Sequence, residues 1–240
     1  MSNLRTLLST TIAILACACS GAVLDTAAAG SPSHRGHHGR AHRAHHRAHK
    51  AHRAHAAHHR SARRSHVGRR SHAVTETITL ATPCQNTELT PAPDNLGEID
   101  AATLCLINQE RARNGELPLQ VSAQLEEAAQ GHSDEMVSED YFAHVAPSGL
   151  TPVARVESTG YVPNPQVGYA LGENLAWGTM PLATPSAIVA AWIASPEHLA
   201  NILYSPYRDT AIGVAPAAPP SLAGGQPGAV YTQEFGVILR

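Results

Sequence analysis

The alternation of hydrophobic and polar residues marks a globular region that begins near residue 98. In residues 101–114, apolar side chains recur at helical spacing and Gly115 follows, which predicts a helix with a glycine stop. A longer helix is predicted from Ser122 to about Glu139, because a capping serine precedes a continuous apolar stripe. The stripe consists of Leu125, Ala128, Ala129, His132 and Met136.

Three shorter helices are predicted from their start signals. Residues 151–152 and 184–185 are Thr-Pro pairs, and residues 195–196 are a Ser-Pro pair. Each pair places a capping hydroxyl directly before a proline in the first helical turn. Gly160 ends the first of these helices. The second has three apolar residues predicted to face inward, Ile188, Val189 and Trp192.

The C-terminal region has a β-like pattern. Residues 210–215 and 230–239 are rich in strand-forming residues, and a Pro/Gly-rich loop, 216–228, separates them. This arrangement predicts an antiparallel hairpin. Helices that precede and flank a small antiparallel sheet predict an α+β fold, arranged as a three-layer αβα sandwich with one core.

The first 29 residues have the features of a secretory signal. Arg5 supplies a positive charge, residues 7–24 contain the apolar region, and small residues at 27–29 form a cleavage site. Polar residues interrupt the apolar run, which disfavours a permanent membrane span. A lipoprotein signal with lipidation at Cys17 is the alternative. Either signal predicts a secreted or extracytoplasmic protein.

Two cysteines remain once the signal is removed, Cys84 and Cys105. In an exported domain such a pair predicts one disulfide, which would join the N-terminal leader to the first helix. Closing a loop of about 20 residues stabilises a fold by roughly 3 kcal/mol in the chain-entropy view. Two free buried thiols are the alternative.

The net charge of −2 conceals a strong asymmetry along the chain. Residues 30–73 contain eleven Lys or Arg and no acid, whereas residues 74–240 contain five Arg and eighteen acids. The first segment, here called the arm, also contains 13 of the 16 histidines. It has almost no large apolar residue and is predicted to be disordered by itself. A proline-containing leader, residues 74–97, connects it to the domain at 98–240.

The composition of the arm indicates two kinds of partner. Its histidines are often four apart, so a transient helix would present pairs of ligands to divalent metals such as Ni²⁺, Cu²⁺ or Zn²⁺. Its fixed positive charges would attract anionic cell-envelope polymers or a lipid surface. A solvated spacer without a partner is the alternative. Nucleic acid is not expected, because the protein is exported and the arm has no aromatic residue for stacking on bases.

Three residues are the candidates for chemistry, His144, Glu173 and His198. Each lies at or beside a predicted break in the chain, from which side chains can converge on a cleft. Two neutral imidazoles and a carboxylate could hold Zn²⁺ or another divalent cation, with water as a fourth ligand. The structural alternative is a hydrogen-bonded polar cluster without a ligand. His132, on the apolar stripe, is expected to be a buried core histidine.

Six segments occur in an order and spacing that resemble a known family. They are LINQERARNGELPL, LEEAAQGHSDEM, YFAHVAPSG, GENLAWG, AWIASPEHLANIL and YTQEFG, within residues 101–240. The chain is identified as similar to bacterial members of the CAP superfamily, which includes cysteine-rich secretory, antigen 5 and pathogenesis-related proteins and is defined by the SCP domain. The resemblance implies an αβα sandwich whose cleft is lined by two His and two Glu.

The resemblance implies that His144, Glu173 and His198 correspond to three of the four cleft residues. Ser195 occupies the position that the second glutamate would take, so the set is incomplete. We therefore expect a monomeric binding module that acts at or outside the cell envelope rather than an enzyme. A metal-assisted hydrolase that uses the same three residues is the alternative. No GxSxG motif is present, so a serine hydrolase is not expected.

Overall fold

The computed structural model describes residues 15–17, 25–27 and 83–239 of the 240-residue chain. The chain divides into two units, residues 1–30 with 78–240 and residues 31–77. The arm and most of the predicted signal and leader lie outside the described residues. In the part of the chain that is described, no helix combines the length and apolar character needed to cross a membrane.

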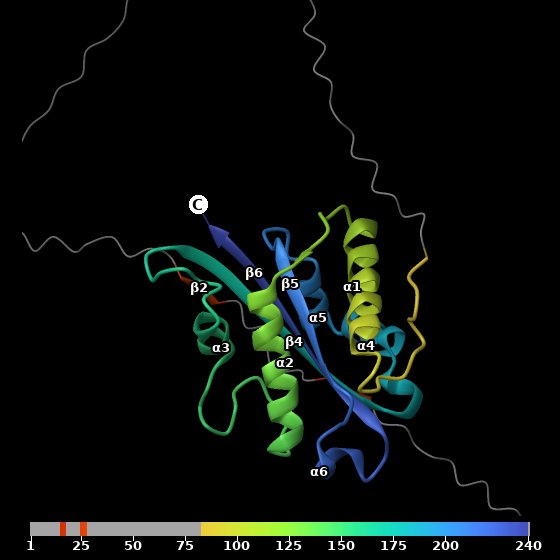
Figure 1. The fold of residues 1–240 in the computed structure, drawn as a ribbon. Helices are drawn as coiled ribbons and strands as arrows, with labels where there is room; N and C mark the ends of the chain where they lie inside the picture. Colours follow the sequence, from red (N-terminus) through yellow and green to blue (C-terminus); the bar gives the residue numbers. More distant parts are fainter. Residues whose placement is uncertain (1–14, 18–24, 28–82, 240) are drawn as a thin grey trace, which may run out of the picture. The chain divides into compact units, whose positions relative to one another are not determined.

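The centre of the first unit is a mixed sheet in the order β1-β4-β6-β5-β3, with β2 also paired to β4 (Figure 1). Its strands are β1 (Leu15–Cys17), β2 (Asp25–Ala27), β3 (Gln120–Val121), β4 (Gly168–Thr179), β5 (Asp209–Ala215) and β6 (Gly228–Leu239). The predicted hairpin is confirmed, because β5 and β6 pair antiparallel from Thr210 with Phe235 to Ala215 with Val230. The sheet is not purely antiparallel, since β3 pairs parallel with β5.

The helices begin largely where their sequence signals predict. They are α1 (Leu96–Arg113), α2 (Ala123–Ser138), α3 (Pro152–Ser158), the 3₁₀ helix η1 (Met180–Ala183), α4 (Pro185–Ala194), α5 (Pro196–Ile202) and α6 (Pro220–Ala223). The side chains of Ser122, Thr151 and Thr184 each accept a hydrogen bond from the backbone N–H three residues later. These bonds satisfy N–H groups that have no partner within the helix. α1 starts five residues before its predicted start at residue 101.

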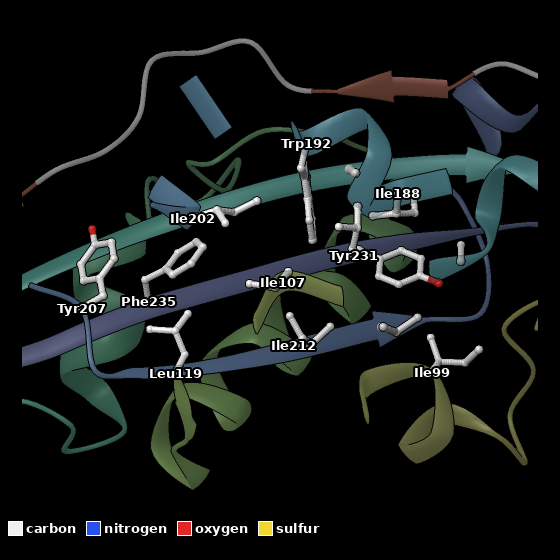
Figure 2. Close-up of a cluster of buried hydrophobic side chains, with 14 of the residues drawn as sticks. Ile99, Ile107, Leu119, Ile188, Trp192, Ile202, Tyr207, Ile212, Tyr231 and Phe235 are labelled. Atoms are coloured by element: carbon white, nitrogen blue, oxygen red, sulfur yellow. The ribbon is translucent and has the colours of Figure 1, made fainter. Parts of the chain in front are cut away.

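Helices cover both faces of the sheet, which confirms the predicted three layers (Figure 1). On one face, α1, α4 and α5 pack on the central strands around the fully buried Trp192 (Figure 2). The indole N–H of Trp192 donates a hydrogen bond of 3.1 Å to the carbonyl of Leu175, which fixes α4 over β4. On the other face, α2 and α3 pack against the strands through separate apolar clusters.

The contact between α2 and β5 depends on Gly213. A Cβ atom at this position would overlap the backbone of Ala129 and Gln130 in α2. Close approach also lets the hydroxyl of Ser133 donate to the carbonyl of Gly213 at 2.9 Å. Glycine is therefore required here by space rather than by backbone conformation.

The predicted disulfide between Cys84 and Cys105 is confirmed, with a Cα–Cα distance of 5.7 Å. It ties the segment before α1 to the middle of that helix. Leu89 from the same segment packs against the buried cluster beneath α1 and α4. The leader is thus held covalently at Cys84 and by packing at Leu89.

The segment GENLAWG differs from its prediction. It was expected at a break in the chain, but it lies inside β4, a strand of 12 residues. Almost every residue of β4 is buried, because helices cover both faces of the sheet. A strand buried on both faces lacks the alternation of polar and apolar residues that marks a strand in sequence.

Candidate functional site

Two glutamates face each other across the centre of the sheet. Glu173 of β4 is the direct antiparallel partner of Glu234 of β6, and residues paired in this way project from the same face. That face is the one covered by α2 and α3. Each glutamate is 1% exposed, so two carboxyl groups are placed side by side almost without water.

Three basic side chains surround Glu173. The Nδ1 atom of His144 lies 2.5 Å from Oε1 of Glu173, and Nη2 of Arg155 lies 2.8 Å from Oε2. The Nε2 atom of His132, on α2, lies 4.0 Å from the same Oε2. Both oxygens of Glu173 are therefore paired with basic groups, which is the condition for keeping a carboxylate buried.

The two glutamates differ in protonation. Burial by itself would raise the pKa of Glu173, but the hydrogen bond from His144 and the nearby basic groups of His132 and Arg155 outweigh it and lower this pKa to about 2. Burial raises the pKa of Glu234 well above its ordinary value, and the charge of Glu173 raises it further. The surroundings therefore favour the carboxylate at Glu173 and the neutral carboxylic acid at Glu234.

Arg155 connects this pair to the loop that carries His144. Its Nη2 atom also donates to the carbonyl of His144 at 2.7 Å, and its Nη1 atom donates to the carbonyl of Leu150 at 3.2 Å. One guanidinium thus fixes the carboxylate, the histidine backbone and the end of the loop. Arg155 reaches this position because α3 begins at the capped Thr151, directly after the loop.

His132 is a buried core histidine, as its place on the apolar stripe predicted. It is fully buried, and its Nε2–H donates to the carbonyl of Ala143 at 3.0 Å. Burial lowers the pKa of His132, so the neutral imidazole is favoured. The residue supports the chain just before His144 and contributes to the polar surroundings of Glu173.

His198 does not join the cluster. It lies on α5, and its backbone carbonyl accepts a 3.2 Å hydrogen bond from the side chain of Asn174. Asn174 follows Glu173 in β4, so the two side chains project from opposite faces of the sheet. The Nδ1 atom of His198 is 2.7 Å from the hydroxyl of Ser195 at the start of α5. The structure therefore brings together His144 and Glu173 and places His198 on the other side.

The predicted three-ligand metal site is not assembled in this geometry. Among the described residues, no three His, Cys, Asp or Glu side chains lie in a group that could hold a metal ion. In addition, Arg155 already occupies one oxygen of Glu173. The donors around Glu173 thus do not fit Zn²⁺ or a comparable cation.

The chemistry that remains belongs to His144. Because Nδ1 faces the carboxylate of Glu173, this nitrogen carries a proton, and in the neutral imidazole Nε2 is left as the acceptor. His144 is the most exposed of the five charged or titratable residues in the cluster, at 7%. Val145 and Leu150, in the same loop, are 47% and 40% exposed. An oriented acceptor nitrogen therefore lies beside apolar surface.

Two members of the cluster, Arg155 and Glu234, were missed by the sequence prediction. Glu234 had a signal, because it is the one charged residue within the apolar run of residues 229–239. Arg155 had a weaker one, as one of few bases in an acidic domain. Neither signal shows which partner the charge has, since that depends on the register of β4 against β6.

The fold and the site together define a class of protein. It is a disulfide-bonded domain that has helices on both faces of its sheet and a histidine–glutamate pair at its centre. Residues 104–234 match the family described as the cysteine-rich secretory protein family, or CAP. The match spans more than half of the 240 residues. The chain belongs to the CAP family.

Relatives in this family are found among bacteria. The uncharacterised protein YkwD of Bacillus subtilis (strain 168) is 29% identical over 156 residues, which are 65% of this chain and 53% of YkwD. This chain thus spans about half the length of that relative. Among solved structures, an extracellular SCP-domain protein of Bacillus anthracis str. Ames has 24% identity and a TM-score of 0.44, covering 60% of this chain and 43% of that chain.

A second solved structure is that of an outer surface protein of Borrelia burgdorferi. It has 18% identity and a TM-score of 0.45, covering 57% of this chain and 90% of that chain.

Proposed function

We propose that this protein is an exported binding module that holds its ligand at the loop of His144. The observation that carries the proposal is the hydrogen bond between His144 and the buried, Arg155-paired Glu173. This bond fixes the tautomer and the orientation of the imidazole before any ligand arrives. Export is supported by the signal-like residues 1–29 and by the disulfide between Cys84 and Cys105.

The chemistry of the loop selects the kind of ligand. Nε2 of His144 accepts a hydrogen bond, so the ligand supplies a hydroxyl or an amide N–H. Val145 and Leu150 supply exposed apolar surface on either side of the turn that joins Ala146 to Leu150. Fragments of cell-envelope glycopeptide combine these features, because they carry hydroxyl and amide groups next to methyl groups.

Binding is favoured over catalysis by the pairing of Glu173. A general base needs a free oxygen or nitrogen within reach of the proton that it removes. The oxygens of Glu173 are both engaged by His144 and Arg155. A hydrolase in which His144 activates water through Nε2 is the second candidate, and the same oriented imidazole supports it.

The test uses the full exported chain and soluble peptidoglycan fragments. Isothermal titration calorimetry would compare the wild type with His144→Gln and with the control Glu127→Gln, an exposed residue of α2. We expect His144→Gln to weaken binding about tenfold or more, as for loss of one hydrogen bond to an oriented partner. Equal affinity in the two variants would contradict the proposal. Cleavage of the fragments by the wild type, if it is lost in His144→Gln, would establish the hydrolase instead.

We also propose that the arm, residues 30–73, attaches the protein to anionic envelope polymers. The support is its eleven fixed positive charges and the absence of any acid in it. Its thirteen histidines add charge as the pH falls below about 6.5. Attachment is therefore expected to strengthen in mild acid and to weaken with salt.

A further inference from the structure

A cavity of about 500 Å³ lies between α1 and α2 at β5. None of the residues of the His144 site lines it. The lining consists of Gly97, Asp100, Ala101, Leu104, Cys105, Asn108, Val121, Glu126, Ala211 and Ile212. The volume lies in the range that small organic ligands occupy in proteins.

The cavity contains two acids and no base. Asp100 comes from α1 and Glu126 from α2, so the two carboxyl groups approach from different helices. The third polar side chain is Asn108, and its amide is already used, with Oδ1 accepting from and Nδ2 donating to the backbone of Leu119 at 2.8 and 3.2 Å. Asn108 is therefore not available to neutralise or solvate the acids.

Asp100 is incompletely satisfied in the structure. Its Oδ1 atom is buried and has no hydrogen-bond partner. A buried carboxyl oxygen without a partner costs free energy, so such an atom in a native fold needs an explanation. Here the atom belongs to a residue that lines a cavity, and a donor that enters the cavity would satisfy it.

The walls of the cavity are largely apolar. Leu104, Val121 and Ile212 contribute hydrophobic side chains, and Val121 is 62% exposed at the rim. An inorganic divalent cation prefers a shell of six or more oxygen atoms. Two carboxyl groups between aliphatic walls do not provide such a shell, whereas they suit a molecule with one charged end and one apolar end.

We propose that this cavity binds a small organic monocation of the alkylammonium type. Its charged head donates hydrogen bonds to Asp100 and Glu126, and its hydrocarbon part covers Leu104, Val121 and Ile212. The binding module thus has a second site, separate from His144, that recognises amines. Free amines and the amino groups of peptides share this chemistry.

The protonation of Asp100 makes the binding depend on pH. Burial, and then the charge of Glu126, raises the pKa of Asp100 to about 7. The phenol of Tyr231, on β6, is another titratable group that interacts electrostatically with Asp100. Below pH 7 the carboxyl group is neutral and attracts a cation less. Binding of the cation favours the carboxylate, so it releases a proton from Asp100 near neutral pH.

The experiment uses the full chain and n-hexylammonium as the probe, followed by isothermal titration calorimetry. Neutral hexanol, which has the same hydrocarbon part, and Ca²⁺, which has only charge, serve as comparisons. We expect hexylammonium to bind at least about tenfold more tightly than hexanol, because an ionic hydrogen bond is worth this much. The affinity of a dipeptide that ends in lysine, compared with that of hexylammonium, distinguishes peptide amines from free amines as ligands.

Substitutions locate the site. Asp100→Asn and Glu126→Gln should each weaken hexylammonium about tenfold, as for loss of one ionic hydrogen bond. The neighbouring exposed control Glu127→Gln and the other-site variant His144→Gln should leave it unchanged. Asp100→Asn removes a half-buried acid whose pKa is raised, so it should fold with an unchanged or higher melting temperature. Proton release on binding is measured by calorimetry at pH 7 in two buffers of different ionisation enthalpy. It should disappear in Asp100→Asn.

Three results would overturn the proposal. Equal affinity for hexanol and hexylammonium would show an apolar pocket only. Unchanged binding in both Asp100→Asn and Glu126→Gln would place the amine elsewhere. Tight binding of Ca²⁺ that is lost in the same two variants would show an inorganic cation site. Because His144→Gln separates the two sites, failure here leaves the proposed function of the His144 loop untouched.

Discussion

Replacing each glutamate of the central pair by glutamine should have very different effects on stability. Glu173 is an ionised residue that holds His144 and Arg155, so Glu173→Gln leaves the buried guanidinium without its counter-charge. The surroundings of Glu234 favour its neutral form, and Glu234→Gln puts a neutral group of similar shape in its place. The two changes are chemically identical and differ only in the state of the residue that is replaced.

The magnitude follows from the pKa of Glu173. This pKa falls from 4.5 to about 2, and a tenfold change in proton affinity corresponds to about 1.4 kcal/mol, so the folded surroundings favour the carboxylate by about 3 kcal/mol. Removing one partner of a buried ion pair costs about 3–5 kcal/mol, which agrees. We therefore expect Glu173→Gln to lower the free energy of unfolding by about 3 kcal/mol at pH 7, and Glu234→Gln to leave it unchanged or to raise it.

The dependence on pH has opposite signs at the two residues. A lowered pKa means that the stabilisation from Glu173 is complete above pH 4.5 and is lost as the pH falls through about 2. A raised pKa means that Glu234 destabilises the fold increasingly as the pH rises above its unfolded value of about 4.5. Relative to the wild type, Glu234→Gln should therefore gain stability with rising pH, whereas Glu173→Gln should gain it in strong acid.

Urea denaturation followed by tryptophan fluorescence gives these free energies, with the exposed Glu127→Gln as the control. Equal losses in Glu173→Gln and Glu234→Gln at pH 7 would refute the assignment of one charged and one neutral carboxyl group. A larger loss in Glu234→Gln would reverse it.

Three further predictions concern other parts of the protein. Gly213→Ala should destabilise the domain by at least about 2 kcal/mol in thermal unfolding, since the added methyl group overlaps α2; a change within error would show that α2 moves freely. Replacing Cys84 and Cys105 together by serine should cost about 3 kcal/mol in urea, matched by the reduced wild type; an unchanged midpoint would contradict this. Deleting residues 30–73 should abolish retention on immobilised Ni²⁺ and poly-glutamate, and retention by the deleted form would contradict the role of the arm.

Local signals in the sequence predicted much of the fold. The capping residues Ser122, Thr151 and Thr184 marked three helix starts, because each cap is an interaction between neighbours in the chain. The hairpin of β5 and β6 was also predicted, because strands that follow one another in the chain often pair. The strand β4 was missed, because its residues are buried on both faces and show no alternation.

The site was predicted only in part, because it depends on pairings across the sheet. The partnership of Glu173 with Glu234 joins positions far apart in sequence, and nothing local fixes which residues of β4 and β6 are opposite. The prediction for His198 depended on the face of the sheet that α5 covers, and a shift of one residue along a strand reverses that face. The contact between Asn174 and His198 places the histidine on the face opposite Glu173.

The most direct test of this account is a titration of the two glutamate carboxyl carbons by NMR. Glu173 and Glu234 would be assigned by comparing ¹³C spectra of the wild type with those of the two glutamine variants, across a range from about pH 2 to about pH 8 that brackets the ordinary carboxyl pKa. The account predicts that Glu173 stays ionised until the pH approaches its pKa of about 2 and that Glu234 keeps its proton to a pH well above 4.5. Ordinary titration of both groups near pH 4.5 would contradict it, and the oriented imidazole of His144 would then have no fixed anion behind it.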